Sequence, residues 1–163
     1  MKIIIISDIH DHEVNLKKAL NWCGKEGISQ MICCGDVTNN ETLRIISQNF
    51  EGKVYLVRGN IELYAEEDLK NYNNIEYGGR VAVWKFENIT VGACHEPYLI
   101  AKVLEKGSPD IVFYGHTHKP WEETQEKTRI INPGTLSGTF SRATFAVFDT
   151  ESGELELKLV DKI

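Results

Sequence analysis

The fold is decided near the start of the chain, by the stretch Lys2-Ile3-Ile4-Ile5-Ile6-Ser7-Asp8. A continuous aliphatic run of this kind is typical of a buried strand. Residues 13–23 then carry apolar side chains at positions 16, 19, 20 and 23, the spacing of one helix face, and Gly24 and Gly27 indicate the end of that helix. A second aliphatic run, Gln30–Cys34, follows. This order predicts parallel strands joined by a right-handed crossover.

The remaining elements extend this pattern into an α/β fold. Thr38 and Glu41 form a capping-box pattern for a helix through about Asn49, and residues 54–57 predict a third strand. A hairpin over 81–86 and 89–93, a helix over 98–106 and strands over 111–114, 128–131, 144–148 and 154–160 follow. We predict a parallel-rich first half, an antiparallel second half, and two packed mixed β-sheets flanked by helices.

Length and composition indicate one soluble globular domain over residues 1–163. The longest purely aliphatic run has four isoleucines, fewer than the about 7–15 apolar residues of a secretory signal or the about 18 of a membrane helix. The four cysteines show no C-x-x-C pair, and Cys33 and Cys34 lie in an apolar run, as buried thiols of a reducing compartment do. We therefore expect a cytoplasmic protein without a membrane partner.

The charge balance argues against long nucleic acid as a partner. The chain has 18 Lys and Arg against 24 Asp and Glu, a formal net charge of −6, and its basic residues are scattered. Proteins that grip long nucleic acid usually present a basic stripe to the phosphates. If this protein handles phosphate, a group other than Lys and Arg must supply positive charge.

Five of the predicted strands end in side chains that bind metal ions. Ligands of open α/β sheets bind outside the carboxyl ends of the strands. Each short motif alone is more often a turn, a cap or a loop histidine, but Gly115-His116-Thr117-His118 directly after a strand has little structural reason to exist. The ordered set predicts a metal site formed by Asp8, His10, Asp36, Asn60, His95, His116 and His118.

The donor atoms of these seven residues indicate the kind of metal. None is a thiol, which excludes a structural zinc site of the cysteine type. Carboxylate, amide oxygen and imidazole suit Mn or Ni, with Fe, Co or Zn as alternatives. Seven ligands exceed the need of one catalytic ion, so we expect two divalent ions about 3.5–4 Å apart.

In this order, the motifs Asp8-x-His10, Gly35-Asp36, Gly59-Asn60, His95 and Gly115-His116-Thr117-His118 resemble the calcineurin-like metallophosphoesterase superfamily. The length, the start of the chain and Ile131-Asn132-Pro133-Gly134 are similar to its small YfcE-type phosphodiesterase branch. The resemblance covers nearly the whole chain. It implies a sandwich of two mixed sheets, a small phosphate-ester substrate and a possible homo-oligomer.

The resemblance also implies a role for each ligand. Asp8, His10, Asp36 and His118 would hold one ion, and Asp36, as a bridge, would hold the other with Asn60, His95 and His116. A hydroxide between the ions would attack phosphorus in line. We expect His10, Asp36, Asn60 and His95 to carry the hydrolysis of small phosphodiesters.

Three positions decide how far the resemblance extends. Many superfamily phosphatases have a histidine, a proton donor or charge stabiliser, where this chain has Ile61, which favours esters with good leaving groups. Glu96 replaces a glycine after His95, so it either reshapes the pocket wall or brings a carboxylate to the second ion. Glu62 lies where the resemblance implies an acidic residue, and we expect its carboxylate to orient neighbouring groups of the site.

Other candidates are weaker than these. His12, Cys94 and Arg142 are better explained as a solvated helix-start residue, a buried thiol and a surface residue, although each is near a motif. The loops around Tyr64, Tyr98 and Trp121 are expected to shape the pocket.

Two other functions remain as alternatives. One is a metal-dependent phosphomonoesterase. The other is a non-catalytic, protein-binding scaffold of the same fold, as in the retromer coat, and Ile61 and Glu96 favour this scaffold. The seven intact ligands argue against the scaffold, and the acidic charge argues against a nuclease acting on long DNA or RNA.

Overall fold

The first of two sheets is built around the isoleucine run. A computed structural model describes residues 1–163, and its six-stranded sheet has the order β11-β10-β1-β2-β3-β4. Strands β1 to β4 are parallel, as predicted for the first three, while β10 pairs antiparallel with both β1 and β11. The strands are β1 (Lys2–Ile6), β2 (Gln30–Cys33), β3 (Lys53–Leu56), β4 (Ile75–Tyr77), β10 (Thr144–Asp149) and β11 (Leu155–Leu159).

The second sheet has five strands in the order β5-β6-β7-β9-β8. These are β5 (Val81–Phe86), β6 (Ile89–Cys94), β7 (Ile111–Phe113), β8 (Trp121–Gln125) and β9 (Thr128–Asn132). The predicted hairpin is β5 and β6, but β6, β7 and β9 are parallel to one another. The prediction of an antiparallel second half was therefore wrong in part, because a helix crosses between β6 and β7 and allows them to run in the same direction.

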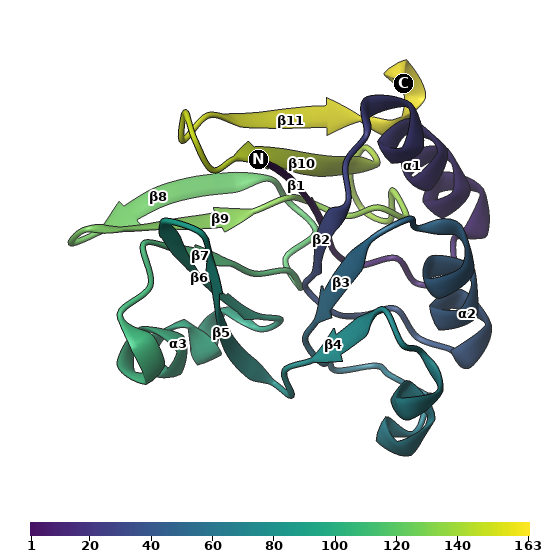
Figure 1. Cartoon of the computed structure of the whole chain (residues 1–163), viewed down its shortest axis with the longest axis horizontal. Coiled ribbons are helices and arrows are strands. Elements are labelled where there is room, and N and C mark those ends of the chain that lie inside the picture. Colours follow the sequence, from purple (N-terminus) through teal and green to yellow (C-terminus); the bar gives the residue numbers. More distant parts are fainter.

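Helices cover the outer faces of both sheets (Figure 1). Helices α1 (Glu13–Glu26) and α2 (Asn40–Asn49) lie beside the first sheet, and α3 (Ile100–Gly107) lies beside β5 and β6. Three short 3-10 helices complete the chain: η1 (Glu66–Asn71), η2 (Pro97–Leu99) and η3 (Val160–Lys162). No helix has the length and apolar character that crossing a bilayer requires.

The alternating sides of β1 explain why its isoleucines are all buried. Ile4 and Ile6 belong to the core cluster that contains Leu16 of α1 and Leu43 of α2. Ile3 and Ile5 belong to a second cluster that includes side chains of β6 and β7. A strand covered on both faces needs apolar residues at every position, whereas a strand with one wet face alternates. The fold therefore has two sheets face to face, with helices outside.

Several local predictions need correction. Gly24 does not end α1, which continues to Glu26 and is capped by Gly27 with φ 67°. The predicted capping box is wrong as well, because the N-cap of α2 is Asn39 and not Thr38. The N–H of Thr38, which Glu41 would accept in a capping box, instead donates to the Glu62 carboxylate at 2.7 Å. Strands β4 and β8 were not predicted. The first has only three residues, and the second is exposed at every position and lacks an apolar pattern.

Candidate metal centre

The structure brings all seven predicted ligands together at one edge of the molecule. They follow β1, β2 and β3 of the first sheet and β6 and β7 of the second, at the carboxyl ends of these parallel strands. Asp8, Asp36 and His95 are buried, His10 and His118 are partly covered, and Asn60 and His116 are exposed. The cluster thus has a buried floor of carboxylates and an open side that a ligand can reach.

The first group in the cluster consists of Asp8, His10 and His118. The Oδ1 atom of Asp8 lies 3.1 Å from Nε2 of His118 and 3.7 Å from Nε2 of His10. The two Nε2 atoms are 3.2 Å apart. These three donor atoms surround one point, as the ligands of a cation do.

The second group contains Asp36 and His95, with Asn60 and His116 on its open side. The Oδ2 atom of Asp36 lies 3.2 Å from Nε2 of His95 and 3.9 Å from Nε2 of His10, so this oxygen faces both groups. The amide oxygen of Asn60 is 2.9 Å from both Nε2 of His95 and Nδ1 of His116. The arrangement also places Asp8 beside the second group, with 4.0 Å between its Oδ1 and Nε2 of His95.

Two observations show that the cluster fits a cation. The Oδ1 atom of Asp8 is buried without a hydrogen-bond partner, a costly state for a carboxylate oxygen. His118 donates its Nδ1–H to the carbonyl of Thr139 at 3.1 Å, so its neutral ring has an unprotonated Nε2 that faces Nε2 of His10. A positive ion satisfies both the carboxylate oxygen and the facing nitrogen lone pairs.

A hydrogen bond also fixes the ring of His95. Its Nδ1 lies 2.7 Å from the carbonyl oxygen of Cys34, which can only accept, so Nδ1 carries the proton. The other nitrogen, Nε2, is then free to bind a metal ion on the side of Asp36. Backbone carbonyls that orient metal-binding histidines in this way are common around metal sites.

The carboxylates shift the pKa values of the histidines. The nearby carboxylate of Asp8, with Oδ1 3.7 Å from Nε2 of His10, raises the pKa of His10, and burial opposes this only in part. Burial lowers the pKa of His95, but the hydrogen bond to Asp36 and the charges of Asp8 and Asp36 outweigh it, so the net shift is upward. Burial likewise acts to raise the pKa of Asp36, yet His95 keeps it below the ordinary value. In the absence of metal, the carboxylates thus favour the protonated forms of His10 and His95.

Five of the ligands sit in a left-handed backbone conformation that side chains rarely adopt. The φ angles are 54° for Asp8, 46° for His10, 53° for Asp36, 68° for His116 and 58° for His118. Such conformations cost of the order of 1–3 kcal/mol each and cluster at functional sites. They are held here by backbone bonds between the loops, for example from the N–H groups of Ile9 and His10 to the Asp36 carbonyl at 3.0 Å.

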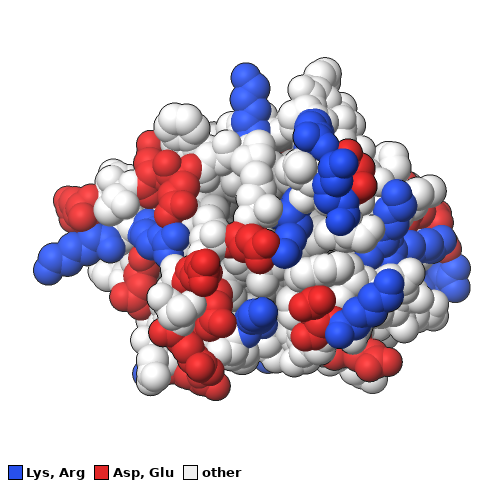
Figure 2. Space-filling view, turned by 90° about the horizontal axis from the view of Figure 1, so that it is seen from above, with Lys and Arg blue, Asp and Glu red and all other residues white.

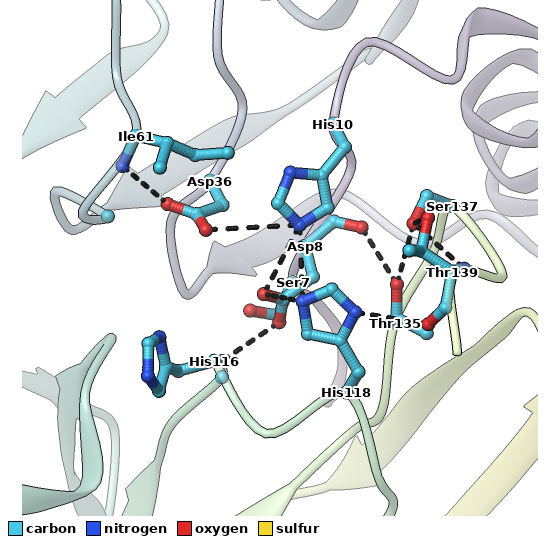
Figure 3. A network of polar contacts seen from close by, with 12 residues as sticks. Ser7, Asp8, His10, Asp36, Ile61, His116, His118, Thr135, Ser137 and Thr139 are labelled. Atoms are coloured by element: carbon cyan, nitrogen blue, oxygen red, sulfur yellow. Dashed lines mark hydrogen bonds and ion pairs between the residues drawn. The ribbon is translucent and has the colours of Figure 1, made fainter. Parts of the chain in front are cut away.

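A loop after β9 supports the centre and was not predicted as part of it. Thr135 Oγ1 donates to the carbonyl of Asp8 at 3.0 Å, and Ser137 Oγ lies 2.8 Å from Thr135 Oγ1 (Figure 3). Asn132 donates its amide to the carbonyl of Gly115 at 2.7 Å. The alternation of hydroxyl residues at 135, 137, 139 and 141 was the available signal, since four hydroxyls in one loop need partners.

Glu62 and Ile61 organise the loops between β2 and α2 and after β3. The Glu62 carboxylate accepts backbone N–H groups of Val37, Thr38 and Gly59 at 2.7–3.2 Å, in agreement with the predicted orienting role. Burial raises the pKa of Glu62, although these donors oppose the shift. The N–H of Ile61 donates to Asp36 Oδ1 at 3.1 Å, which leaves Oδ2 for the histidines.

The weaker candidates lie outside the cluster. The ring of His12 caps α1, and Arg142 pairs with Asp161 at 2.8 Å. Cys94 is buried, and burial raises the pKa of its thiol to about 12, so it is inert. The Glu96 carboxylate bonds to Arg80 and to the Tyr98 hydroxyl, which favours a pocket-wall role over one at the second ion. Tyr64 is buried in the core, whereas Tyr98 and Trp121 are exposed.

The surface charge is mixed. In Figure 2, acidic side chains gather toward the end of the molecule formed by β8 and β9, and basic side chains are more frequent at the opposite end. No continuous basic stripe crosses this face. This face therefore offers no extended basic surface to a polyanion.

Comparison with known proteins identifies relatives over the whole chain. Phosphodiesterase MJ0936 of Methanocaldococcus jannaschii is 29% identical over 162 residues, covering 94% of this chain and 96% of that protein. Phosphodiesterase YfcE of Escherichia coli K12 is 24% identical and covers 84% of this chain and 80% of its own length. Vacuolar protein sorting-associated protein 29 of Saccharomyces cerevisiae is 26% identical, covering 99% of this chain and 64% of that protein.

Solved structures agree with these relatives. An archaeal phosphodiesterase superimposes with a TM-score of 0.86 and 27% identity, covering 98% of this chain and 99% of the other. The model of the calcineurin-like phosphoesterase superfamily domain matches residues 1–153, which include all seven clustered ligands. The chain belongs to the calcineurin-like phosphoesterase superfamily.

Proposed function

We propose that this protein is a metal-dependent phosphoesterase that hydrolyses small phosphodiesters. The observation that carries the proposal is the buried Oδ1 of Asp8, without a hydrogen-bond partner, among the nitrogen donors of His10 and His118. A buried carboxylate in that state requires a positive partner. Family membership and the phosphodiesterase relatives point to the same chemistry.

Two divalent ions fit the two groups of side chains. Asp8, His10 and His118 would hold one ion, and His95, Asn60 and His116 the other, with Asp36 shared between them. When bound, such ions lower the pKa of coordinated water, polarise phosphoryl oxygens and neutralise developing charge. The oxygen and nitrogen donors suit Mn²⁺ or Ni²⁺, with Fe, Co and Zn as alternatives.

The protein's own groups position this chemistry. Asp36 Oδ1 accepts the N–H of Ile61, which leaves Oδ2 directed toward both histidine groups. The carbonyl oxygen of Cys34 accepts the Nδ1–H of His95 and so holds that ring in one tautomer. The side chain of Ile61 holds no proton that it can donate to a leaving group. We therefore infer a preference for diesters whose leaving groups depart as stable anions.

The surroundings of the centre limit the substrate. The net charge of −6 and the mixed surface disfavour long polyanions, whereas a small phosphate ester meets only the local charge of the centre. Four buried, free cysteines favour a reducing compartment, and we propose a cytoplasmic location. A homo-oligomer remains part of the proposal, and the molecular mass in solution tests it.

The proposal is tested by assaying bis(p-nitrophenyl) phosphate and p-nitrophenyl phosphate with added Mn²⁺ or Ni²⁺. We expect metal-dependent turnover of the diester, and a loss of about 100-fold or more in Asp36→Asn, because the shared oxygen is altered. Asp161→Asn is the matched control, since this exposed carboxylate only pairs with Arg142. No turnover of either ester with any divalent ion would contradict the proposal, and faster turnover of the monoester would favour a phosphomonoesterase.

The second candidate is a non-catalytic scaffold. The likeness to yeast vacuolar protein sorting-associated protein 29 and the isoleucine at position 61 favour it. A scaffold has no use for a strained and buried ligand cluster, which favours the enzyme. Equilibrium dialysis with Mn²⁺ combined with the diester assay separates the two: about two ions per chain with turnover fit the enzyme, and a folded protein without turnover fits the scaffold.

A further inference from the structure

Phe140 is an aromatic side chain that the fold leaves almost wholly in water. It is 91% exposed, whereas the large phenylalanines of the core are buried completely. Its backbone is also left-handed, with φ 65°, a conformation that is a true outlier for a bulky residue. Exposure and strain at one residue both cost stability, and such a combination points to a role in binding.

The position of Phe140 is set by the metal centre. The residue before it, Thr139, accepts the Nδ1–H of His118, and the residue after it, Ser141, donates its hydroxyl to the carbonyl of His118 at 2.6 Å. The rings of Phe140 and His118 have centroids 5.6 Å apart at an angle of 50°. The aromatic face is therefore held beside a ligand whose other ring nitrogen faces Asp8.

A second apolar side chain flanks the centre on the side of Asp36. Ile61 is 43% exposed, and in Figure 3 its side chain extends past Asp36 toward His10. Arg142, a cationic residue two positions after Phe140, forms an ion pair with Asp161. The rim next to these ligands thus offers apolar surface close to the place where a phosphoryl group would bind.

We propose that Phe140 is the contact for an apolar, preferably aromatic, ester group of the substrate. The inference rests on the proposed phosphodiesterase function and adds a substrate class to it. A phosphodiester bound at the centre has two ester groups, and we assign the one retained in the product to the rim beside Phe140. An aromatic group stacks on Phe140, whereas a methyl group finds too little surface to contact.

The test compares two diesters that release the same leaving group. Water converts phenyl p-nitrophenyl phosphate to phenyl phosphate, and methyl p-nitrophenyl phosphate to methyl phosphate, with p-nitrophenolate and a proton released from both. The ratio of the two kcat/KM values therefore isolates the retained group. We expect Phe140→Ala to reduce the phenyl-to-methyl ratio about three- to tenfold, the range of an aromatic pair.

Two further variants sharpen this result. Phe140→Tyr keeps the ring and should keep the ratio, and Leu157→Ala, which truncates an exposed apolar residue of β11, should not change it. Calorimetric titration of the Mn²⁺-loaded protein with phenylphosphonate and methylphosphonate gives a readout without turnover. There, Phe140→Ala should weaken only the binding of phenylphosphonate.

The outcomes separate this inference from the proposed function. Hydrolysis of both diesters with a ratio that Phe140→Ala leaves unchanged, or an equal loss for both phosphonates, would overturn the contact alone. Absence of hydrolysis for both diesters in the unaltered protein would overturn the phosphodiesterase function on which it rests.

Discussion

Gly115 occupies a position beside Asp8 where no side chain fits. A Cβ atom there would lie 1.9 Å from Ser7 Oγ and 2.8 Å from Asp8 Oδ2. Gly115→Ala must therefore displace a residue at the floor of the metal centre. We expect it to lower the free energy of unfolding by about 1–3 kcal/mol and to weaken Mn²⁺ binding, as measured by urea unfolding and calorimetric titration.

Gly24 offers the matched control for that substitution. It lies inside α1, and a Cβ atom there would meet nothing within 4 Å. Gly24→Ala should raise the free energy of unfolding by about 0.5–1 kcal/mol, because alanine loses less conformational freedom than glycine in a helix. Equal destabilisation by both substitutions would show that Gly115 has no special packing role.

The histidines of the centre predict how metal affinity depends on pH. Both His10 and His95 have raised pKa values without metal, and a metal ion binds only the deprotonated ring nitrogen. Mn²⁺ affinity should therefore fall as the pH is lowered toward and below about 6.5, the ordinary histidine value. Calorimetric titrations at a series of pH values check this, and a constant affinity would contradict it.

The same pKa shifts give the opposite trend for the metal-free protein. A histidine whose pKa is higher in the folded than in the unfolded protein stabilises the fold fully at pH values below its unfolded-state pKa. This stabilisation is lost as the pH rises through the folded-state pKa. Without metal, unfolding should become easier over the pH range in which Mn²⁺ binding becomes stronger.

At the scale of elements, Glu62 joins the loop after β2 to the loop after β3. Its carboxylate accepts three backbone N–H groups, and removing it leaves those donors without a partner. Glu62→Ala should lower the free energy of unfolding by about 2–4 kcal/mol and reduce turnover. The exposed Glu67 of η1 is the control, and its alanine variant should stay within about 0.5 kcal/mol of the parent protein.

Elements differed in how well the sequence predicted them. The run Ile3–Ile6 and the helix face of α1 have strong local periodicity, and both predictions are confirmed. Strand β8 is polar after Trp121 and exposed at every position, because it is an edge strand whose side chains need no apolar pattern. The capping box at Thr38 was wrong, because a carboxylate distant in sequence, Glu62, competes for the same N–H.

At the scale of the whole molecule, the centre joins two sheets. Ligands from the first sheet (Asp8, Asp36) meet a ligand from the second (His95), so metal binding bridges the two halves of the core. At a Mn²⁺ concentration 100 times the Kd, linkage adds about 2.7 kcal/mol to the unfolding free energy. The Tm should rise by about 5–10 °C, as measured by calorimetry.

Two controls complete this prediction. A chelator should reverse the rise in Tm, and the protein should stay folded because its core clusters contain no metal ligand. Asp36→Asn should show little response to Mn²⁺, whereas Asp161→Asn should respond as the parent does. An unchanged Tm in the presence of metal would contradict a bridging centre.

The sequence by itself determined which side chains are able to bind metal and that each follows a strand. Both features are local, since strand periodicity and the residues just after a strand are read over a few positions. Convergence of the two sheets, the support from Thr135 and the exposed ring of Phe140 beside His118 were decided only by the tertiary structure. These contacts join residues far apart in the chain, and only packing of the whole core determines which distant loops meet.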